Sequence, residues 1–242
     1  MPDAMLLAAA VFAGAVVSGL AGFAFSAAAG AILIHLLSPQ EAVPLMMACS
    51  IAVQAASLVS LRHSVRWRES LRYIIGGGLG LAPALYLLVH VDAGKFRIGF
   101  GVFLVIYSAY MLARPRVQFL RAAETRVYDA LVGFAGGLVG GLTAMPGAAP
   151  IVWCDLQGFP KEQQRGLVQP FIAAMQLVSM AILFATGHIS SRLAVEFATV
   201  LPALAVGTAL GIYLFGKVGD ATFRRIVLVA LLVSGGSFIW HV

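Results

Sequence analysis

Phe12-Ala-Gly-Ala-Val-Val-Ser-Gly-Leu20 is the first of two copies of an apolar, glycine-rich motif, and Phe134-Ala-Gly-Gly-Leu-Val-Gly-Gly-Leu142 is the second. Polar residues beyond the motif also match. These pairs are Gln54 with Gln176, Ser57 with Ser179, Tyr86 with Tyr213 and Asp92 with Asp220. Chance similarity between two apolar runs is the alternative, and the matched polar positions argue against it. The chain therefore contains an internal repeat.

The repeat divides the chain into two halves that form one membrane domain. We interpret residues 1–115 as the first half and residues 127–242 as the second. The stretch 116–126 is a basic linker, which we expect on the cytoplasmic side because loops there carry an excess of Lys and Arg.

The composition is that of an integral membrane protein. Hydrophobic residues make up 61% of the 242 residues, charged residues make up 11%, and the mean hydropathy is +0.95. A soluble domain carries about 25% charged residues. Several uncharged runs approach the roughly 20 residues that a helix needs to cross a bilayer. The net charge of +6 comes from basic residues between these runs, so it indicates membrane topology and no nucleic-acid partner.

Each half contains four hydrophobic blocks. They are Met5–Leu37, Ala42–Leu61, Leu71–Val91 and Phe96–Ala113, then Val127–Leu156, Gly166–Gly187, Leu193–Gly216 and Phe223–Trp240. The opening block of each half is too long for one helix and breaks near its middle, at 18–26 and at 140–147. Each arm would have about 14–16 residues, or ~21–24 Å against a hydrocarbon core of ~30 Å. We expect two re-entrant hairpins.

Charge placement favours inverted halves. If each opening block crossed the membrane once, the Lys and Arg residues would divide almost evenly between the two sides. If each is a hairpin, thirteen of the sixteen share one side, and only Lys95, Arg97 and Arg192 lie on the other. The positive-inside rule favours the hairpins. The predicted fold is all-α, with two inverted repeats, each an interrupted re-entrant hairpin plus three transmembrane helices.

Inverted halves with broken helices are a recurrent design of secondary transporters, which bind substrate near the midplane. A half-helix that begins after a hairpin tip directs its N–H groups and positive dipole end at that site, which suits an anion. The candidate binding residues at the tips are Gly22, Phe23, Ser26, Thr143, Met145 and Gly147. For Gly14, Gly19, Gly136 and Gly141 we favour a role in helix packing.

Gln54 and Gln176 are further candidates, because a polar amide inside a membrane helix needs a partner. That partner is either the substrate or a neighbouring helix. His35, Asp155 and Glu196 lie near predicted helix ends, where an interfacial role is favoured over a proton relay.

Motifs of enzymes and metal sites do not occur in the sequence, so we expect no catalytic residue, metal or cofactor. The two cysteines, Cys49 and Cys154, lie in apolar segments, and we read them as small membrane residues.

Three stretches of the second half form a recognisable pattern: Gly133-Phe-Ala-Gly-Gly-Leu-Val-Gly-Gly-Leu-Thr143, Pro146-Gly-Ala-Ala-Pro150 and Gly158-Phe-Pro-Lys-Glu-Gln-Gln-Arg165. In these stretches the second half resembles the sulfite exporter TauE/SafE (TSUP) family. The first half looks like the family's first repeat, but Gly22-Phe-Ala-Phe-Ser-Ala-Ala28 replaces its glycine-rich tip. The bulkier tip is a reason to consider other sulfur anions besides sulfite.

The resemblance implies transport of sulfite, a sulfonate such as sulfoacetate, or a related organosulfur acid across the bacterial cytoplasmic membrane. We expect export by alternating access around a midplane site between the two hairpins. A passive anion channel and an uptake carrier for another small solute are the alternatives. The expected partners are a small anion and the lipid bilayer. Proton and sodium ion are both candidates for coupling, and a homodimer is a candidate assembly.

Overall fold

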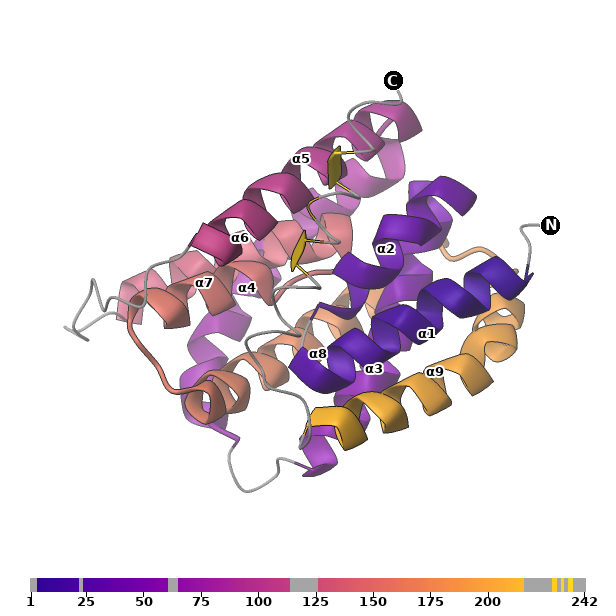
Figure 1. Ribbon diagram of the computed structural model, residues 1–242. Helices are drawn as coiled ribbons and strands as arrows, with labels where there is room; N and C mark the ends of the chain where they lie inside the picture. Colours follow the sequence, from indigo (N-terminus) through magenta and orange to yellow (C-terminus); the bar gives the residue numbers. More distant parts are fainter. Residues whose placement is uncertain are drawn as a thin grey trace. The chain divides into compact units, whose positions relative to one another are not determined.

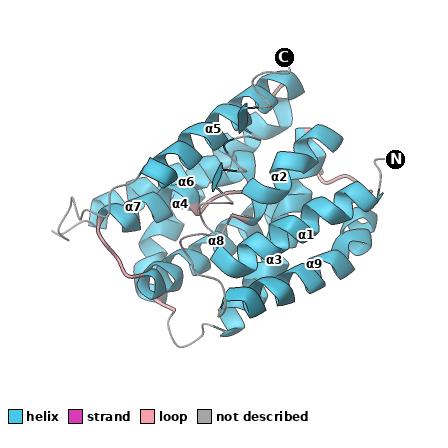
Figure 2. Ribbon diagram, viewed as in Figure 1, coloured by secondary structure: helices cyan, strands magenta, loops and turns pink. Residues whose placement is uncertain are grey.

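The computed structural model describes residues 4–21, 24–60, 65–113 and 126–215, with 228–229, 232 and 235–236. The helices labelled in Figure 1 are α1 Ala4–Ala21, α2 Phe25–Leu36, α3 Pro39–Ser60, α4 Trp67–His90, α5 Ala93–Ala113, α6 Arg126–Thr143, α7 Ala148–Leu156, α8 Lys161–Ala185 and α9 Leu193–Phe215. In this part of the chain all regular secondary structure is helical, as Figure 2 shows. The predicted all-α class is confirmed.

Four of the described helices, α4, α5, α8 and α9, are long and apolar enough to cross a membrane. Helix α3, with 22 residues, covers the block in which we expected a fifth crossing. The sixth expected crossing, Phe223–Trp240, lies mostly outside the described residues. Six crossings and the inversion of the halves stay predictions.

The first opening block is a hairpin. Gly14 on α1 lies so close to α2 that a Cβ there would be 2.8 Å from the Cβ of Ala29 and 3.0 Å from the carbonyl oxygen of Phe25. In one continuous helix, positions 14 and 29 would be ~22 Å apart at 1.5 Å per residue. Helix α2 therefore returns along α1.

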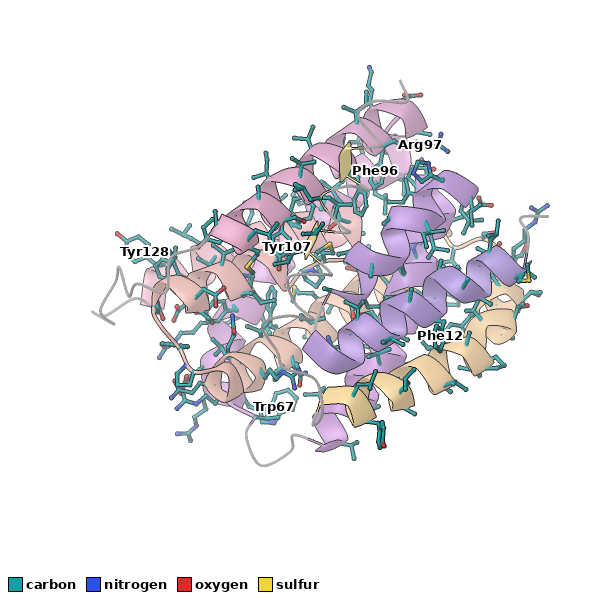
Figure 3. The ribbon with its side chains drawn as sticks, viewed as in Figure 1. Phe12, Trp67, Phe96, Arg97, Tyr107 and Tyr128 are labelled. Atoms are coloured by element: carbon teal, nitrogen blue, oxygen red, sulfur yellow. The ribbon has the colours of Figure 1, made fainter. Side chains whose placement is uncertain are left out.

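The second opening block also turns back. The ring of Tyr128, labelled in Figure 3, lies at the beginning of α6, and its centroid is 6.1 Å from that of Trp153 in α7. The indole Nε1 of Trp153 donates to Oδ1 of Asp129 at 3.2 Å. The end of α7 thus lies beside the beginning of α6. Both opening blocks fold back on themselves as predicted, and their re-entry on the same side of the membrane stays a prediction.

The expectation that the two arms of each hairpin have nearly equal lengths is wrong. The arms have 18 and 12 residues in the first hairpin and 18 and 9 in the second. Gly19 and Gly141, which suggested earlier breaks, lie inside α1 and α6 because they permit close packing there. The turns instead contain alanines in the left-handed region, Ala24 with φ 73° and Ala144 with φ 56°.

The chain forms two compact units, and each takes helices from both halves of the sequence. The first unit comprises Met1–Cys49, His90–Arg114 and Ile189–Val242, and the second comprises Ser50–Val89 and Pro115–His188. Helix α4 of the first half thus belongs to the unit of the second hairpin, and α9 of the second half belongs to the unit of the first. The two halves proposed from the sequence are therefore not the same as these two units, and the division into halves stays a prediction.

In the second unit, α4 and α6 pack with their backbones in contact. A Cβ on Gly76 would meet the carbonyl oxygen of Ala130, and one on Gly80 would meet that of Phe134. The residue numbers rise together along both helices, so they run parallel. Small residues allow this close approach in a membrane, where packing replaces the hydrophobic effect as a driving force.

In the first unit, α1 and α9 pack in the same way and lie side by side in Figure 1. A Cβ on Gly207 would be 2.8 Å from the carbonyl oxygen of Phe12, and one on Gly211 would be 2.6 Å from that of Val16. These two helices also run parallel.

The two helix pairs use corresponding positions of the repeat. When Tyr86 is matched to Tyr213, Gly80 corresponds to Gly207. Each of these glycines faces the backbone carbonyl of the phenylalanine that opens the repeated motif in its own unit. The internal contacts of the two units therefore support the repeat that the sequence predicts.

Candidate functional site

The second hairpin tip is the best described part of the predicted site. Helix α6 ends at Thr143, and Ala144 follows in the left-handed conformation, with its N–H donating to the carbonyl oxygen of Gly140 at 2.8 Å. That conformation is costly for a residue with a Cβ, by roughly 1–2 kcal/mol. The chain then folds back so closely that a Cβ on Gly136 would be 2.7 Å from the carbonyl oxygen of Pro146.

The tip rests on one face of α8. Gly147 lies against Val168 and Ile172, because a Cβ there would be 3.4 Å from the first side chain and 2.6 Å from the second. One turn further along α8, Nε2 of Gln176 donates to the carbonyl oxygen of Ala144 at 3.3 Å. The structure thus brings together the predicted residues Gly147 and Gln176.

Other contacts hold this framework in place. Oγ of Ser70 on α4 donates to the carbonyl oxygen of Leu167 on α8 at 2.6 Å. Nε2 of Gln164 on α8 donates to the carbonyl oxygen of Ile151 on α7 at 3.0 Å. Helices α4, α7 and α8 are therefore linked by side-chain bonds to backbone, and α8 presents Gln176 to the tip from a fixed position.

Only one of the two polar atoms of the Gln176 side chain has a described hydrogen-bond partner. Its side chain is 2% exposed, and its Oε1 has no hydrogen-bond partner among the described residues. The contact with a carbonyl oxygen requires Nε2 on that side, so Oε1 faces the other way as an acceptor. A buried polar atom without a partner costs about 1–3 kcal/mol, so such an atom needs an explanation.

Thr143 and Met145 are both buried at the tip. The hydroxyl of Thr143 donates to the carbonyl oxygen of Val139 at 2.7 Å, so its hydrogen is already engaged. We expected the threonine hydroxyl to serve an anion as a donor. In this rotamer it offers only its lone pairs to any other group.

The beginning of α7 offers fewer amide hydrogens than we expected. Ala148 N–H donates to the carbonyl oxygen of Met145 at 3.2 Å, and Ile151 N–H donates to that of Gly147 at 2.9 Å. Pro150 has no N–H. Among the described hydrogen bonds at this turn, none uses the N–H of Gly147 or of Ala149.

The first tip is described only in part. Gly22 and Phe23 lie outside the described residues. Ser26 is buried in the first turn of α2, within the first unit. Ala24 is the N-cap of this helix, and no side chain caps it.

Gln54 on α3 belongs to the second unit, like Gln176, and is 1% exposed. Its Oε1 also lacks a hydrogen-bond partner within the described part of the chain. No described hydrogen bond joins it to the second tip, so its role as a ligand stays a prediction.

The glycines that we assigned to packing do pack. A Cβ on Gly19 would be 2.9 Å from the Cα of Gly211, and one on Gly141 would be 2.6 Å from the Cβ of Ala84. Together with Gly14 and Gly136 above, they confirm that prediction.

Asp129 is the residue that sequence reasoning missed. It is buried near the beginning of α6, and its Oδ1 accepts hydrogen bonds from Oη of Tyr73 at 2.7 Å and from Nε1 of Trp153 at 3.2 Å. A guanidinium nitrogen of Arg72 lies 3.6 Å from Oδ2. Sequence reasoning missed Asp129 because it lies only three residues after the basic linker, where a charged residue needs no explanation, although it is inside the apolar block Val127–Leu156. This cluster lies at the open end of the hairpin, away from the tip.

Asp155, one of the residues considered for a proton relay, accepts a hydrogen bond from Nε2 of Gln164 at 3.3 Å. The described residues contain no group of three His, Cys, Asp or Glu side chains placed to hold a metal ion. Cys49 and Cys154 are both buried free thiols.

The family model for the sulfite exporter TauE/SafE matches residues 6–238. The chain belongs to the TauE/SafE family. The predicted family is therefore confirmed, and this TauE/SafE protein is a membrane transporter from a family of transporters, not of enzymes. Comparison with curated proteins and with solved structures finds no match.

Proposed function

We propose that this protein is a secondary transporter that exports a small sulfur-containing anion across the bacterial cytoplasmic membrane. Sulfite, a sulfonate such as sulfoacetate, and related organosulfur acids are the proposed substrates. Membership of the TauE/SafE family supports this class of substrate and the direction. We propose that the hairpin tips supply the binding groups.

The contact between Gln176 and Ala144 is the observation that carries the proposed site. In a membrane, irregular backbone is tolerated where it is buried in protein or lines a cavity, and transporters use such interruptions to bind substrate. The second tip is an interruption of this kind, and a buried amide with one unused acceptor lies against it.

The tip is the proposed moving element. Since protein atoms cover Oε1 of Gln176, a ligand reaches this atom only when the tip moves away from α8. Separation breaks the 3.3 Å hydrogen bond between Gln176 and Ala144 and the apolar contacts of Gly147 with Val168 and Ile172. The left-handed Ala144 stores strain that a different tip conformation can release. Alternating access then follows from exchange of the tip between positions.

The topology of this proposal places the basic side of the protein in the cytoplasm. Each opening block returns along itself, which is the arrangement that puts thirteen of the sixteen Lys and Arg residues on one side. Such a charge bias sets the orientation of membrane proteins.

Transport by the purified protein in proteoliposomes tests the proposal. A carrier gives saturable flux of radiolabelled sulfite or sulfoacetate and counterflow against the unlabelled substrate, whereas a passive channel gives no counterflow. A carrier without activity towards any sulfur anion would contradict the substrate class.

Two substitutions test the site. Gln176→Leu is expected to lower substrate affinity, and Gln54→Leu is expected to have a similar effect if the repeat places both amides at the substrate. Leu177→Ala is the control, because this neighbour of Gln176 is exposed. If both glutamine variants lose thermal stability but keep substrate affinity, the amides only hold helices together. Polar contacts between membrane helices average about 0.6 kcal/mol, so that loss would be small.

A further inference from the structure

We infer that the guanidinium of Arg72 is an anion-binding site at the open end of the second hairpin, where the substrate docks from the cytoplasm before it reaches the tip. The ligand is a sulfur oxyanion, such as sulfite or the sulfonate group of sulfoacetate. This inference rests on the proposed function, which supplies the substrate and the side of the membrane, and it adds a site that the tip does not include.

The carboxylate of Asp129 holds the guanidinium in place. Its Oδ1 accepts hydrogen bonds from Tyr73 at 2.7 Å and from Trp153 at 3.2 Å, so the carboxylate is fixed between α4 and α7. Its Oδ2 lies 3.6 Å from Nη1 of Arg72. The attraction between opposite charges therefore keeps a long, flexible side chain beside the open end of the hairpin.

The guanidinium of Arg72 keeps its donors for a ligand. The 3.6 Å distance to Asp129 is too long for a good hydrogen bond, and among the described hydrogen bonds none uses this guanidinium. The side chain is 42% exposed, so an anion can reach it. Arg66, by contrast, donates to Glu69 at 2.9 Å. A guanidinium carries five N–H groups in a planar fork, which suits two oxygens of one oxyanion.

The corresponding junction of the first unit has no charge. When Phe12 is matched to Phe134, Leu7 corresponds to Asp129, and when Tyr86 is matched to Tyr213, Thr199 and Val200 correspond to Arg72 and Tyr73. Leu7 and Val200 are buried. An apolar junction thus serves the same helix pair in the first unit, and replacing a buried ion pair by apolar residues is often neutral or stabilising. The fold alone does not account for the charged pair, so we assign it to the ligand.

The location suits the loading of an exporter. The proposed topology places the open end of the second hairpin on the basic, cytoplasmic side, where the exported anion arrives. Between Val127 and Leu156 the sequence contains no Lys or Arg, and in α8 there is none after Arg165. A cation at the entrance raises the local concentration of an anion that must then enter a region without countercharges.

Exchange in membrane vesicles of opposite orientation tests the inference on the full-length protein. Vesicles are preloaded with unlabelled sulfite or sulfoacetate, and uptake of the labelled anion is measured. In inside-out vesicles, which present the cytoplasmic face, Arg72→Gln is expected to raise KM about fivefold, the equivalent of about 1 kcal/mol for a half-exposed ion pair. In right-side-out vesicles KM should stay the same, whereas a structural defect would alter both.

Arg68→Gln is the matched control, because Arg68 lies one turn earlier on α4 and is exposed. It should leave KM on the cytoplasmic side nearly unchanged, and an effect equal to that of Arg72→Gln would replace the site by general surface charge. Arg72→Lys keeps the charge beside Asp129 and removes the fork, so an intermediate rise is expected. This variant carries the test if Arg72→Gln does not fold, and an unchanged KM in it would overturn recognition by the guanidinium.

A phospholipid phosphate is the other oxyanion that could reach Arg72. Proteoliposomes of phosphatidylcholine alone and of phosphatidylcholine with phosphatidylglycerol distinguish the two sources, and the effect of Arg72→Gln on KM should be the same in both. An effect that requires phosphatidylglycerol would assign Arg72 to a lipid and overturn the inference. Unchanged KM in Arg72→Gln, or equal rises on both sides of the membrane, would overturn it while leaving the proposed function intact. Absence of exchange of any sulfur anion by the unmodified protein would overturn both.

Discussion

The phenolic hydroxyl of Tyr73 donates a 2.7 Å hydrogen bond to Oδ1 of Asp129, and it thereby joins a helix of the first half to the hairpin of the second. Trp153 donates to the same oxygen from the returning arm of the hairpin. One buried carboxylate thus connects α4, α6 and α7 at the open end of the hairpin.

Tyr73→Phe should destabilise this junction without affecting the tip. A hydrogen bond to a charged group contributes about 1.5–3 kcal/mol, so the free energy of unfolding should fall by this amount. Thermal unfolding in detergent measures the change, and substrate affinity should not alter. Tyr128→Phe is the control, because Tyr128 is exposed and its ring contact with Trp153 is retained. Equal losses of stability in both variants would contradict the assigned role.

Gly80→Ala should separate α4 from α6. The new methyl group would overlap the carbonyl oxygen of Phe134 and lie 2.9 Å from the backbone nitrogen of Leu138, atoms that cannot rotate away. Overpacking of this kind costs about 1–3 kcal/mol or more. We expect loss of monodisperse protein in size-exclusion chromatography.

Gly78→Ala is the matched control for that experiment. Gly78 lies in the same helix, and a Cβ there would meet nothing within 4 Å. This variant should keep its stability within about 0.5 kcal/mol. Similar behaviour of the two variants would rule out the α4–α6 contact as a source of stability.

The topology predicts which engineered cysteines react with a membrane-impermeant reagent on intact cells. Ala93→Cys and Ser190→Cys should be labelled from outside, whereas Ser64→Cys, Gln118→Cys and Gly219→Cys should be labelled only after the cells are opened. Labelling at Gly219→Cys from outside would refute inverted halves, because parallel halves place this loop on the outer side.

The background in that experiment is low. Cys49 and Cys154 are the two natural cysteines, and both are 0% exposed, so the unmodified protein should react little. Replacement of both by Ala provides a parent chain if residual labelling appears.

Thr143→Val should reduce substrate affinity with little loss of stability. The substitution keeps the shape of the side chain and removes an oxygen whose hydrogen bond lies within its own helix. If this oxygen accepts a hydrogen from the substrate, affinity should fall by about 1–3 kcal/mol. Thr199→Val is the control, because Thr199 makes the same bond to Val195 at 2.8 Å but is exposed. Unchanged affinity in Thr143→Val would exclude this residue from the site.

Composition and the spacing of apolar residues were sufficient to predict the helices and the hairpins. Uninterrupted apolar runs predicted the helices, and interruptions near Gly22 and Pro146 predicted the hairpins. The packing role of Gly19 and Gly141 followed from the general use of small residues in membranes. The lengths of the arms could not be predicted. Glycines near the middle of each block suggested that the first helix ends there, but Gly19 and Gly141 lie inside helices, where they allow a neighbouring helix to pack closely.

Two parts of the candidate site depend on tertiary contacts that have no local signature. The partner of Gln176 is a backbone carbonyl, which any residue at position 144 supplies. The environment of Asp129 is created by Tyr73 and Trp153, which are far from it in sequence. The matched glutamines indicated a buried amide correctly, but they could not show which of its two ends was engaged.

The exchange of helices between the two halves has a consequence for biosynthesis. When the ribosome has completed residues 1–115, α1 still lacks α9, and the glycine face of α4 still lacks α6. The translocon must therefore release helices whose closest partners have not yet been translated. A gene cut within the linker should yield two fragments that are each degraded when produced alone, and that survive when both are synthesised in the same cell.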